Sequence, residues 1–389
     1  MQNVYLDNAA TTRVRDEVIA KMQEALANCY GNPSSTHGFG RSAKTIIETA
    51  RKTIAKYLNA HPSEIIFTSG GTEAVNMILR CAVRDLGVVT IITSKIEHHA
   101  VLHTVEELVS DKGINAHYVK LDSHGNPDLD HLKELLQQDT SKKLVSLMHV
   151  NNEIGNILDI HAITTLCKEF DAYMHSDTVQ SIGHYSWDVQ QIPIDFMTAA
   201  AHKFHGPKGI GFAYLRKNTG LKPMILGGAQ ERGLRAGTEP LHNIVGLEEA
   251  LVLAYENLEE EKKYVADLKA YFIKKIQKEF PQALFNGLSA DMEKSTYTMV
   301  NVRLPISQEK ALMLLFHLDI KGIACSKGSA CQSGSNGGSH VLNELLSGEE
   351  LKKPSLRFSF SKYNTDKEID YVVQVLKDFA RDQTASLIT

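Results

Sequence analysis

The sequence predicts an α/β protein, in which a mostly parallel sheet has helices on both faces and a smaller α+β domain follows. Two observations carry this prediction. Short apolar runs rich in β-branched residues alternate with longer amphipathic stretches, which is typical of parallel strands joined by helical crossovers. After Gly237 the pattern changes, because residues 241–280 form a long, charge-rich helical stretch without a strand-like run.

The first unit begins with an expected helix over residues 15–28, which would pack against the small domain or a partner subunit. The strands expected after it cover residues 65–69, 88–93, 116–121, 144–150, 173–176 and 196–200. The helices expected between them cover residues 72–85, 100–110, 129–137 and 162–170. In the second unit we expect strands over residues 296–304, 323–325 and 356–361, and helices that start at Gln308 and Thr365.

The composition narrows the function. The chain has 389 residues, of which 43% are hydrophobic and 23% charged, as in ordinary globular proteins of two or three domains. Its net charge of −4 gives no general electrostatic reason to bind nucleic acid or an anionic membrane. No apolar run approaches the ~20 residues of a membrane span, and the first residues lack the layout of a signal peptide, so a cytoplasmic location is expected.

Five cysteines without a C-x-x-C pair predict reduced thiols rather than a disulfide framework. Cys331 lies within CSKGSACQSGSNGG, residues 325–338, where Ser and Gly neighbours favour an exposed, reactive and mobile thiol. Cys81 and Cys167 fall in helical patterns and Cys325 closes a strand, so these three are expected to be packed. The Cys-x5-Cys spacing is not that of a zinc site, and no metal is expected.

Three strand ends are candidate ligand contacts. In FTSGGTEA, two glycines and Thr72 stand where a strand meets a helix start, an arrangement that favours phosphate but also fits an ordinary turn. Asp177 ends a strand in HSDTVQS and can keep a ring nitrogen protonated, although an aspartate there is more often an N-cap. His98 and His99 follow a strand in SKIEHHAV, where either imidazole could stack on an aromatic ligand or transfer protons.

Two basic residues are further candidates. Lys203 follows the apolar run of AAAHKFHGPKGIG, so its amine should be poorly solvated, with a lowered pKa, as a Schiff-base lysine requires; a surface lysine at a strand end is the alternative. Lys208, inside the turn, is a weaker candidate. Arg357 in SLRFSFS could bind a carboxylate through two parallel hydrogen bonds, although a surface ion pair is the commoner role.

Taken in order, these motifs resemble the pyridoxal-phosphate-dependent cysteine desulfurases of the NifS/IscS type, within the class V aminotransferase family. The matching strings are YLDNAATT, GNPSSTHGFG, FTSGGTEA, SKIEHHAV, MHVNNEIG, HSDTVQSIG, AHKFHGPKGIG, ERGLRAGTEP, GSACQSG and LRFSFS, which span nearly the whole chain. The resemblance implies a homodimer of the fold type I architecture, with a seven-stranded-type sheet in the domain that binds pyridoxal 5'-phosphate (PLP). It also implies that sulfur is removed from L-cysteine, giving L-alanine and an enzyme persulfide for a sulfur-acceptor or scaffold protein, in iron–sulfur cluster assembly or thiolation.

The resemblance assigns roles by matching position. Lys203 would bind PLP covalently, Asp177 would pair with the pyridinium nitrogen, His98 would stack on the ring, and Cys331 would be the nucleophile that takes the sulfur. The remaining PLP contacts would be Gly71, Thr72, Asn152, Gln180, His202 and, reaching into the other subunit, Thr238. The substrate carboxylate would be held by Arg357, with Asn32 as a second candidate.

The same resemblance divides the chain. Residues 1–14 would be an N-terminal segment that contributes to the active site, and residues 15–240 the large PLP-binding domain. Residues 241–280 would be a connecting helical region, and residues 281–389 a small domain that carries the Cys331 segment. Because this thiol must reach the substrate and later an acceptor, residues 327–338 are expected to move between two positions.

Two departures from the family pattern are visible. Ala200 stands where many relatives have a serine that touches phosphate, and SNGGS at residues 335–339 replaces Ser-Leu-Glu-Pro-Ser, so the usual partner-protein contacts cannot be assumed. Two other functions stay open at this point. A selenocysteine lyase or related PLP lyase would use the same residues. A non-catalytic scaffold would not need Lys203, Asp177 and Cys331, all of which are present.

Overall fold

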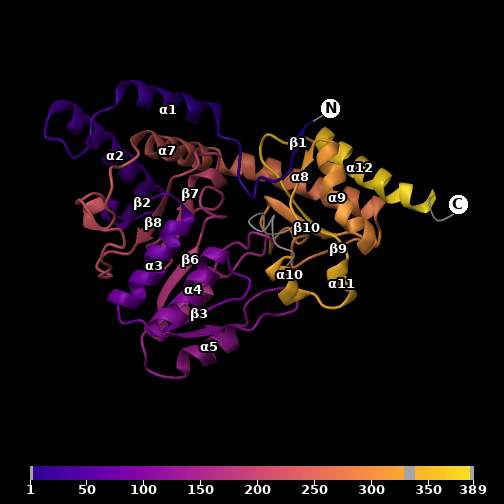
Figure 1. Cartoon of the computed structure of the whole chain (residues 1–389), viewed down its shortest axis with the longest axis horizontal. Coiled ribbons are helices and arrows are strands. Elements are labelled where there is room, and N and C mark those ends of the chain that lie inside the picture. Colours follow the sequence, from indigo (N-terminus) through magenta and orange to yellow (C-terminus); the bar gives the residue numbers. More distant parts are fainter. Residues whose placement is uncertain (1–2, 328–337, 386–389) are drawn as a thin grey trace.

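The computed structural model describes residues 3–327 and 338–385, with side chains described as far as Arg381. Its elements form two groups around separate sheets (Figure 1). The larger sheet has seven strands in the order β2-β8-β7-β6-β5-β3-β4. Their bounds are β2 Ile65–Thr68, β3 Thr90–Thr93, β4 Asn115–Tyr118, β5 Lys143–Ser146, β6 Tyr173–Asp177, β7 Phe196–Ala200 and β8 Gly211–Leu215.

All neighbouring strands of this sheet are parallel except those next to β8, which pairs antiparallel with both β2 and β7. Strand β2 therefore points the same way as β7, and the predicted α/β class with a mostly parallel sheet is confirmed. Strand β8 was not among the expected strands. Short 3₁₀ turns lie beside this sheet at η1 Pro62–Glu64, η2 Ala201–Lys203 and η3 Glu231–Gly233.

Helices cover both faces of the larger sheet. One apolar cluster joins α3 (Gly71–Asp85) and α4 (His99–Lys112) to strand residues such as Ile91. Its neighbour Ile92 belongs to the cluster on the opposite face, because successive strand side chains alternate. The helices of that second face are α1 Asp16–Asn28, α2 Gly38–Tyr57, α5 Leu129–Gln137, α6 Ile160–Glu169 and α7 Leu241–Glu256.

Two expectations for the helices need correction. Helix α1 packs on α7, with Val18 and Ala25 in the core of the larger sheet, and among the described residues the expected contact with the smaller group is limited to Arg15, which binds Glu261 of α8 (Leu258–Glu279) at 2.8 Å. Residues 241–280 form two helices, α7 and α8, separated at Asn257. The amide of Asn257 donates to Leu253 O at 2.9 Å, which caps the first helix and ends it.

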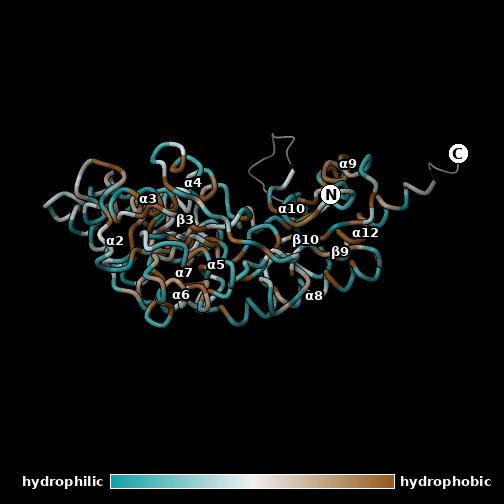
Figure 2. The backbone as a smooth tube through the Cα atoms, turned by 90° about the horizontal axis from the view of Figure 1, so that it is seen from below, coloured by the Kyte–Doolittle hydropathy of each residue, from teal (hydrophilic) through white to brown (hydrophobic). Residues whose placement is uncertain are grey.

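The smaller group is built on an antiparallel sheet of three strands, in the order β12-β10-β9. Its strands are β9 Leu284–Phe285, β10 Met299–Arg303 and β12 Ser355–Ser359, and its helices are α8, α9 Gln308–Ile320, α10 His340–Leu345, α11 Glu349–Lys352 and α12 Asp366–Ala385. Figure 2 shows this group beside the larger one along the molecule, with the end of α12 at the far tip. The division of the chain into domains at residues 14, 240 and 280 stays a prediction.

The N-terminal segment, residues 6–12, crosses from the smaller group into the larger one. Strand β1 (Val4–Tyr5) pairs in parallel with β11 (Ile323–Ala324), and Asp7 forms a parallel bridge with Ser359 of β12. Five residues later, Thr12 N donates to His202 O at 2.9 Å. The segment therefore connects β11 and β12 to the turn that follows β7 of the larger sheet.

An ion pair covers the outer edge of β2, which is an edge strand of the larger sheet. Arg51 Nη1 donates to Ile65 O at 2.6 Å, and Phe67 N donates to Glu231 Oε2 at 2.8 Å. The two side chains also bind each other through two hydrogen bonds of 2.7 Å. Together they satisfy backbone groups that an edge strand otherwise leaves open. Within the described part of the chain, no helix is long and apolar enough to cross a membrane.

Candidate active site

A cavity of about 250 Å³ lies at the carboxyl-terminal edge of the larger sheet. Strands β2, β3, β5, β6 and β7 all point toward this edge, so the residues that follow them meet there. Nine of the residues assigned in the sequence line the cavity: Gly71, Thr72, His98, Asn152, Asp177, Gln180, His202, Lys203 and Arg357.

Lys203 lies in η2, directly after β7, and its amine is held by the N-terminal segment. Lys203 Nζ donates to Ala9 O at 2.6 Å and to Ala10 O at 2.9 Å. Gln180 Nε2 donates to the same Ala9 carbonyl at 2.9 Å. The lowered pKa expected for this lysine stays a prediction, whereas its place in the cavity is clear.

Asp177 closes β6, and its carboxylate is fixed from two sides. Oδ1 accepts from Val179 N at 3.0 Å and from Thr198 Oγ1 at 3.2 Å. Beneath it, the buried His175 shares a hydrogen bond of 2.8 Å with Ser146 Oγ. Burial lowers the pKa of His175 to about 4, so this ring is neutral near pH 7 and brings no positive charge beneath the acid.

His98 is the residue before α4, and its Nδ1 accepts from Ala100 N at 3.1 Å as a helix cap. In the neutral ring this leaves the hydrogen on Nε2. Burial lowers the pKa of His98, so the neutral form is favoured at physiological pH. The sequence alone did not decide which of His98 and His99 would face a ligand. In the structure, both line the cavity.

The opposite end of the cavity suits a phosphate. Helix α3 starts at Gly71, so its first N–H groups face the cavity without intrahelical acceptors. A Cβ at Gly71 would lie 2.7 Å from Val179 Cγ2, so a larger residue here would have to push that side chain aside. Burial lowers the pKa of His202 to about 4, which keeps this ring neutral beside Thr11. Ala200 lines the cavity but offers no hydroxyl.

A salt bridge braces the turn at the start of α3. Glu73, in the first turn of α3, accepts from Ser69 N at 2.8 Å. Arg235 binds the same carboxylate through Nε at 2.9 Å and Nη2 at 3.1 Å. The ERGLRAGTEP segment is therefore attached to the turn that holds Gly71.

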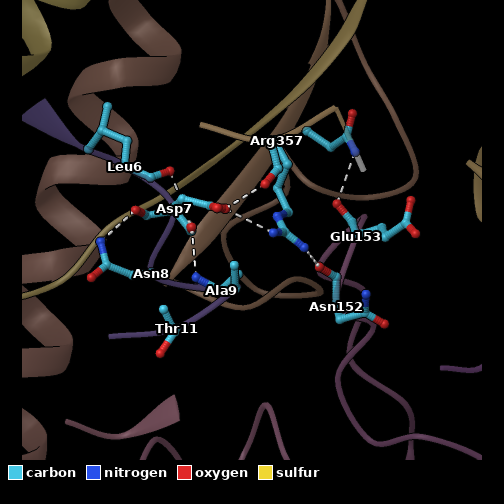
Figure 3. A network of polar contacts seen from close by, with 12 residues as sticks. Leu6, Asp7, Asn8, Ala9, Thr11, Asn152, Glu153 and Arg357 are labelled. Atoms are coloured by element: carbon cyan, nitrogen blue, oxygen red, sulfur yellow. Dashed lines mark hydrogen bonds and ion pairs between the residues drawn. The ribbon is translucent and has the colours of Figure 1, made fainter. Parts of the chain in front are cut away.

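Arg357 of β12 enters the cavity from the smaller group. Its Nη1 donates to Asn152 O at 2.6 Å and its Nη2 to Asp7 Oδ1 at 3.0 Å (Figure 3). The side chain is buried, and among the described residues neither Arg357 Nε nor Asn152 Oδ1 has a hydrogen-bond partner. These two orphaned polar atoms belong to residues that line the cavity, which indicates that a polar ligand completes their bonding.

Among the described residues, two of the assigned ones are not brought into this cavity. Thr238 is exposed and Asn32 is exposed, with the Asn32 side chain accepting from Ser34 N at 2.9 Å. Their roles stay predictions. Cys331 lies outside the described residues, which omit 328–337. The expected movement of residues 327–338 therefore stays a prediction. Burial raises the pKa of the Cys325 thiol, in agreement with its expected packing.

Sequence reasoning missed several residues at the site. The Ala9 and Ala10 carbonyls act through the backbone, which no side-chain motif reveals. Asp7 lies within the YLDNAATT string but about 350 positions from its partner Arg357. His340, on the cavity wall, has a ring centroid 4.4 Å from that of His99.

A buried acid lies beside that histidine. Glu153 accepts from Ser339 Oγ, and burial raises the pKa of its carboxyl. A short Asn-Glu string within MHVNNEIG was the only signal for this position.

The residues present fit PLP. The cavity combines an acid for a ring nitrogen, an amine for an aldehyde, a neutral imidazole for ring stacking and a glycine-bounded helix start for phosphate. The orphaned Asn152 Oδ1 offers one further polar contact. Among the described residues, no group of three or more His, Cys, Asp or Glu side chains could hold a metal ion.

Comparisons with known proteins agree with this chemistry. The aminotransferase class-V family model matches residues 4–372. The chain is 41% identical over 381 residues to a protein named cysteine desulfurase IscS from Dictyoglomus turgidum, covering 97% of this chain and 94% of that one. It is also 41% identical over 381 residues to cysteine desulfurase IscS of Methanosarcina thermophila, covering 97% of this chain and 92% of that one.

Solved structures give the same picture. A NifS-like protein superposes with a TM-score of 0.87 at 36% identity, covering 97% of this chain and 99% of that chain. A structure described as SspA in complex with cysteine has a TM-score of 0.79 at 31% identity, covering 93% of this chain and 100% of that chain.

Proposed function

This chain belongs to the class V aminotransferase family and is a PLP-dependent cysteine desulfurase, and from this premise we propose which of its residues perform each part of the reaction. The observation that supports the assignment is the cavity in which Lys203, Asp177 and Arg357 converge from η2, β6 and β12. These three side chains provide an amine, a fixed acid and a group that can bind a carboxylate, all lining one cavity.

PLP, when bound, withdraws electrons from the carbon that bears the substrate's amino group. Asp177 would hold a proton on the ring nitrogen, with Val179 N and Thr198 Oγ1 keeping its carboxylate in place. His98 would stack on the ring as a neutral imidazole. Gly71 and the start of α3 would bind the phosphate, and Arg357 would bind the α-carboxylate of L-cysteine.

Two residues of the chain would move the proton and the sulfur. The Lys203 amine would carry a proton at Nζ to and from the substrate carbon. The Cys331 thiolate would attack the substrate sulfur, so that the carbon–sulfur bond of L-cysteine breaks and a sulfur–sulfur bond forms on the enzyme. The carbon fragment takes up the proton and leaves as L-alanine, which balances cysteine plus thiol against alanine plus persulfide.

We also propose a homodimer that acts in the cytoplasm and passes its sulfur to a protein acceptor. In support of a dimer, Thr238 is exposed in the single chain, and exposed apolar side chains lie nearby in sequence, such as Leu226 at 81%. In support of a reducing compartment, Cys29, Cys81, Cys167 and Cys325 are free thiols. Sedimentation should show a dimer, and an active PLP-loaded monomer at low concentration would contradict this assignment.

The lysine assignment is tested by trapping. Borohydride reduction of the loaded enzyme, digestion and mass spectrometry should place the pyridoxyl group on Lys203. The matched control is Lys208, which belongs to the same turn but does not line the cavity. Modification at Lys208, or none at all, would rule out the proposed role of Lys203.

The cysteine assignment is tested by a pair of variants. Cys331→Ala should bind PLP and L-cysteine but release alanine only at background level. Cys325→Ala should keep most of its activity, because burial raises the pKa of that thiol and disfavours the thiolate. The reverse pattern would move the nucleophile to Cys325.

A further inference from the structure

The guanidinium that we assign to the substrate carboxylate already holds a carboxylate of the chain itself. Asp7 Oδ1 accepts from Arg357 Nη2 at 3.0 Å, while Nη1 donates to Asn152 O at 2.6 Å (Figure 3). Arg357 is 2% exposed, so its charge is poorly screened by solvent. A substrate carboxylate that enters the cavity therefore meets an arginine with an acid beside it.

The Asp7 carboxylate is held in this place by a second partner. The same Oδ1 accepts from Ser326 Oγ at 2.7 Å, so moving the side chain away breaks two hydrogen bonds. The backbone is fixed as well, because residue 7 bridges Ser359 and Asn8 Nδ2 donates to Ser359 O at 2.8 Å. The Asp7 side chain is 18% exposed, so solvent screens its interaction with Arg357 only in part.

We propose that Asp7 is a specificity-determining residue, an internal competitor that sets how strongly Arg357 binds the carboxylate of the substrate and product. The inference rests on the proposed function, in which Arg357 binds that carboxylate. An incoming carboxylate must displace Asp7 from Nη2 or share the guanidinium with it against like-charge repulsion. Either event weakens the binding of alanine as well as cysteine, and so favours release of the product.

The same arrangement disfavours other anions. Without Asp7, the buried guanidinium would be an uncompensated positive charge in an open cavity, which would attract simple carboxylates from solution. With Asp7 in place, only a ligand that gains further contacts elsewhere in the cavity can displace the internal acid. Asp7 would thus select ligands that bear both a carboxylate and an amine.

The test compares two ligands that differ only in the carboxylate, L-alanine and ethylamine. Each is titrated into the PLP-loaded enzyme, and the equilibrium dissociation constant is read from the absorbance of the bound cofactor. Asp7→Asn keeps an oxygen acceptor for Arg357 and Ser326 but removes the charge. We expect this variant to bind L-alanine about three- to tenfold more tightly, as removal of one partly screened like charge would produce, and to bind ethylamine as the wild type does.

A kinetic measurement and two controls complete the test. In Asp7→Asn the KM for L-cysteine should fall by a similar factor, and inhibition by added L-alanine should increase. A merely structural role for Asp7 would not produce this pair of changes. Asp7→Ser, a second uncharged variant, should act in the same direction if Asp7→Asn fails to fold. Asp188 accepts hydrogen bonds from Gln190 and Asn59 in a turn. Asp188→Asn removes its charge and should change the dissociation constant of neither L-alanine nor ethylamine.

The outcomes separate the two proposals. Unchanged or weaker L-alanine binding in both uncharged variants would overturn the role of Asp7, and so would an equal gain for ethylamine. Arg357→Lys tests the underlying assignment, because it should weaken L-alanine binding but not ethylamine binding. If Arg357→Lys leaves L-alanine binding unchanged, the proposed carboxylate site itself is wrong.

Discussion

Glu231→Gln is expected to lower the free energy of unfolding by about 3–5 kcal/mol, because it leaves the buried charge of Arg51 with only the partly exposed Glu48 as an anionic partner among the described residues. The Glu231 carboxylate accepts two hydrogen bonds of 2.7 Å from Arg51 and one of 2.8 Å from Phe67 N. Both charged side chains are only 2% exposed, so water cannot replace the lost interaction. Glutamine has nearly the same volume and retains one oxygen acceptor, so the variant loses the charge and places an NH2 donor where the second oxygen accepted a hydrogen bond.

The matched control is Glu48→Gln. Glu48 accepts from Nε of the same Arg51 at 3.0 Å, but its side chain is 34% exposed. Exposed ion pairs contribute about 0–1 kcal/mol, so this variant should unfold close to the wild type. Urea unfolding of both variants, followed by circular dichroism, measures the difference between them.

The same variant has a consequence for cofactor binding. Strand β2 ends just before Gly71, and the Arg51–Glu231 pair fixes the outer edge of that strand. Loosening the edge should weaken PLP binding in Glu231→Gln but not in Glu48→Gln. If Glu231→Gln costs no more stability than Glu48→Gln, the argument that burial makes this ion pair important is wrong.

Two further predictions concern charge in the core. Asp177→Asn should still form the Lys203 adduct but lose alanine release on the order of 100-fold, because an amide cannot hold a proton on the ring nitrogen; activity within threefold of wild type would contradict this. Burial lowers the pKa of His149 to about 4 from the usual 6.5. The neutral ring therefore contributes fully to stability above pH 6.5, and this contribution of about 3 kcal/mol is lost as the pH falls from 6.5 to 4. His149→Phe should therefore lose less stability than wild type between those pH values, and parallel curves would refute the prediction.

The sequence predicted the strand-end residues best. Asp177 and Lys203 follow apolar runs that form β6 and β7, and the geometry of parallel strands alone brings such ends to one edge. Their place at this edge followed from the strand pattern, whereas their roles were assigned by the family resemblance and stay predictions. For the same reason the fold class was predictable, since the alternation of elements is a local property.

What could not be predicted depends on distant or backbone contacts. Strand β8 is short and apolar like its neighbours, and nothing local indicates that it runs antiparallel. Helix α2 begins with GFGRSAK, in which two glycines lower the helix propensity, and the helix packs against α7. The Asp7–Arg357 pair joins residues 350 positions apart, so no spacing rule could find it.

The N-terminal segment has a consequence for the order in which this chain can mature. Residues 4–12 are synthesised more than 300 residues before their partners β11 and Ser359. Contacts of such high sequence separation form late, because the chain must first lose the conformational entropy of closing a loop of about 350 residues. The carbonyls that hold Lys203 therefore reach their final positions only after β11 and β12 have been synthesised, so a nascent chain, or one truncated before β11, should fold its larger sheet without forming a competent site.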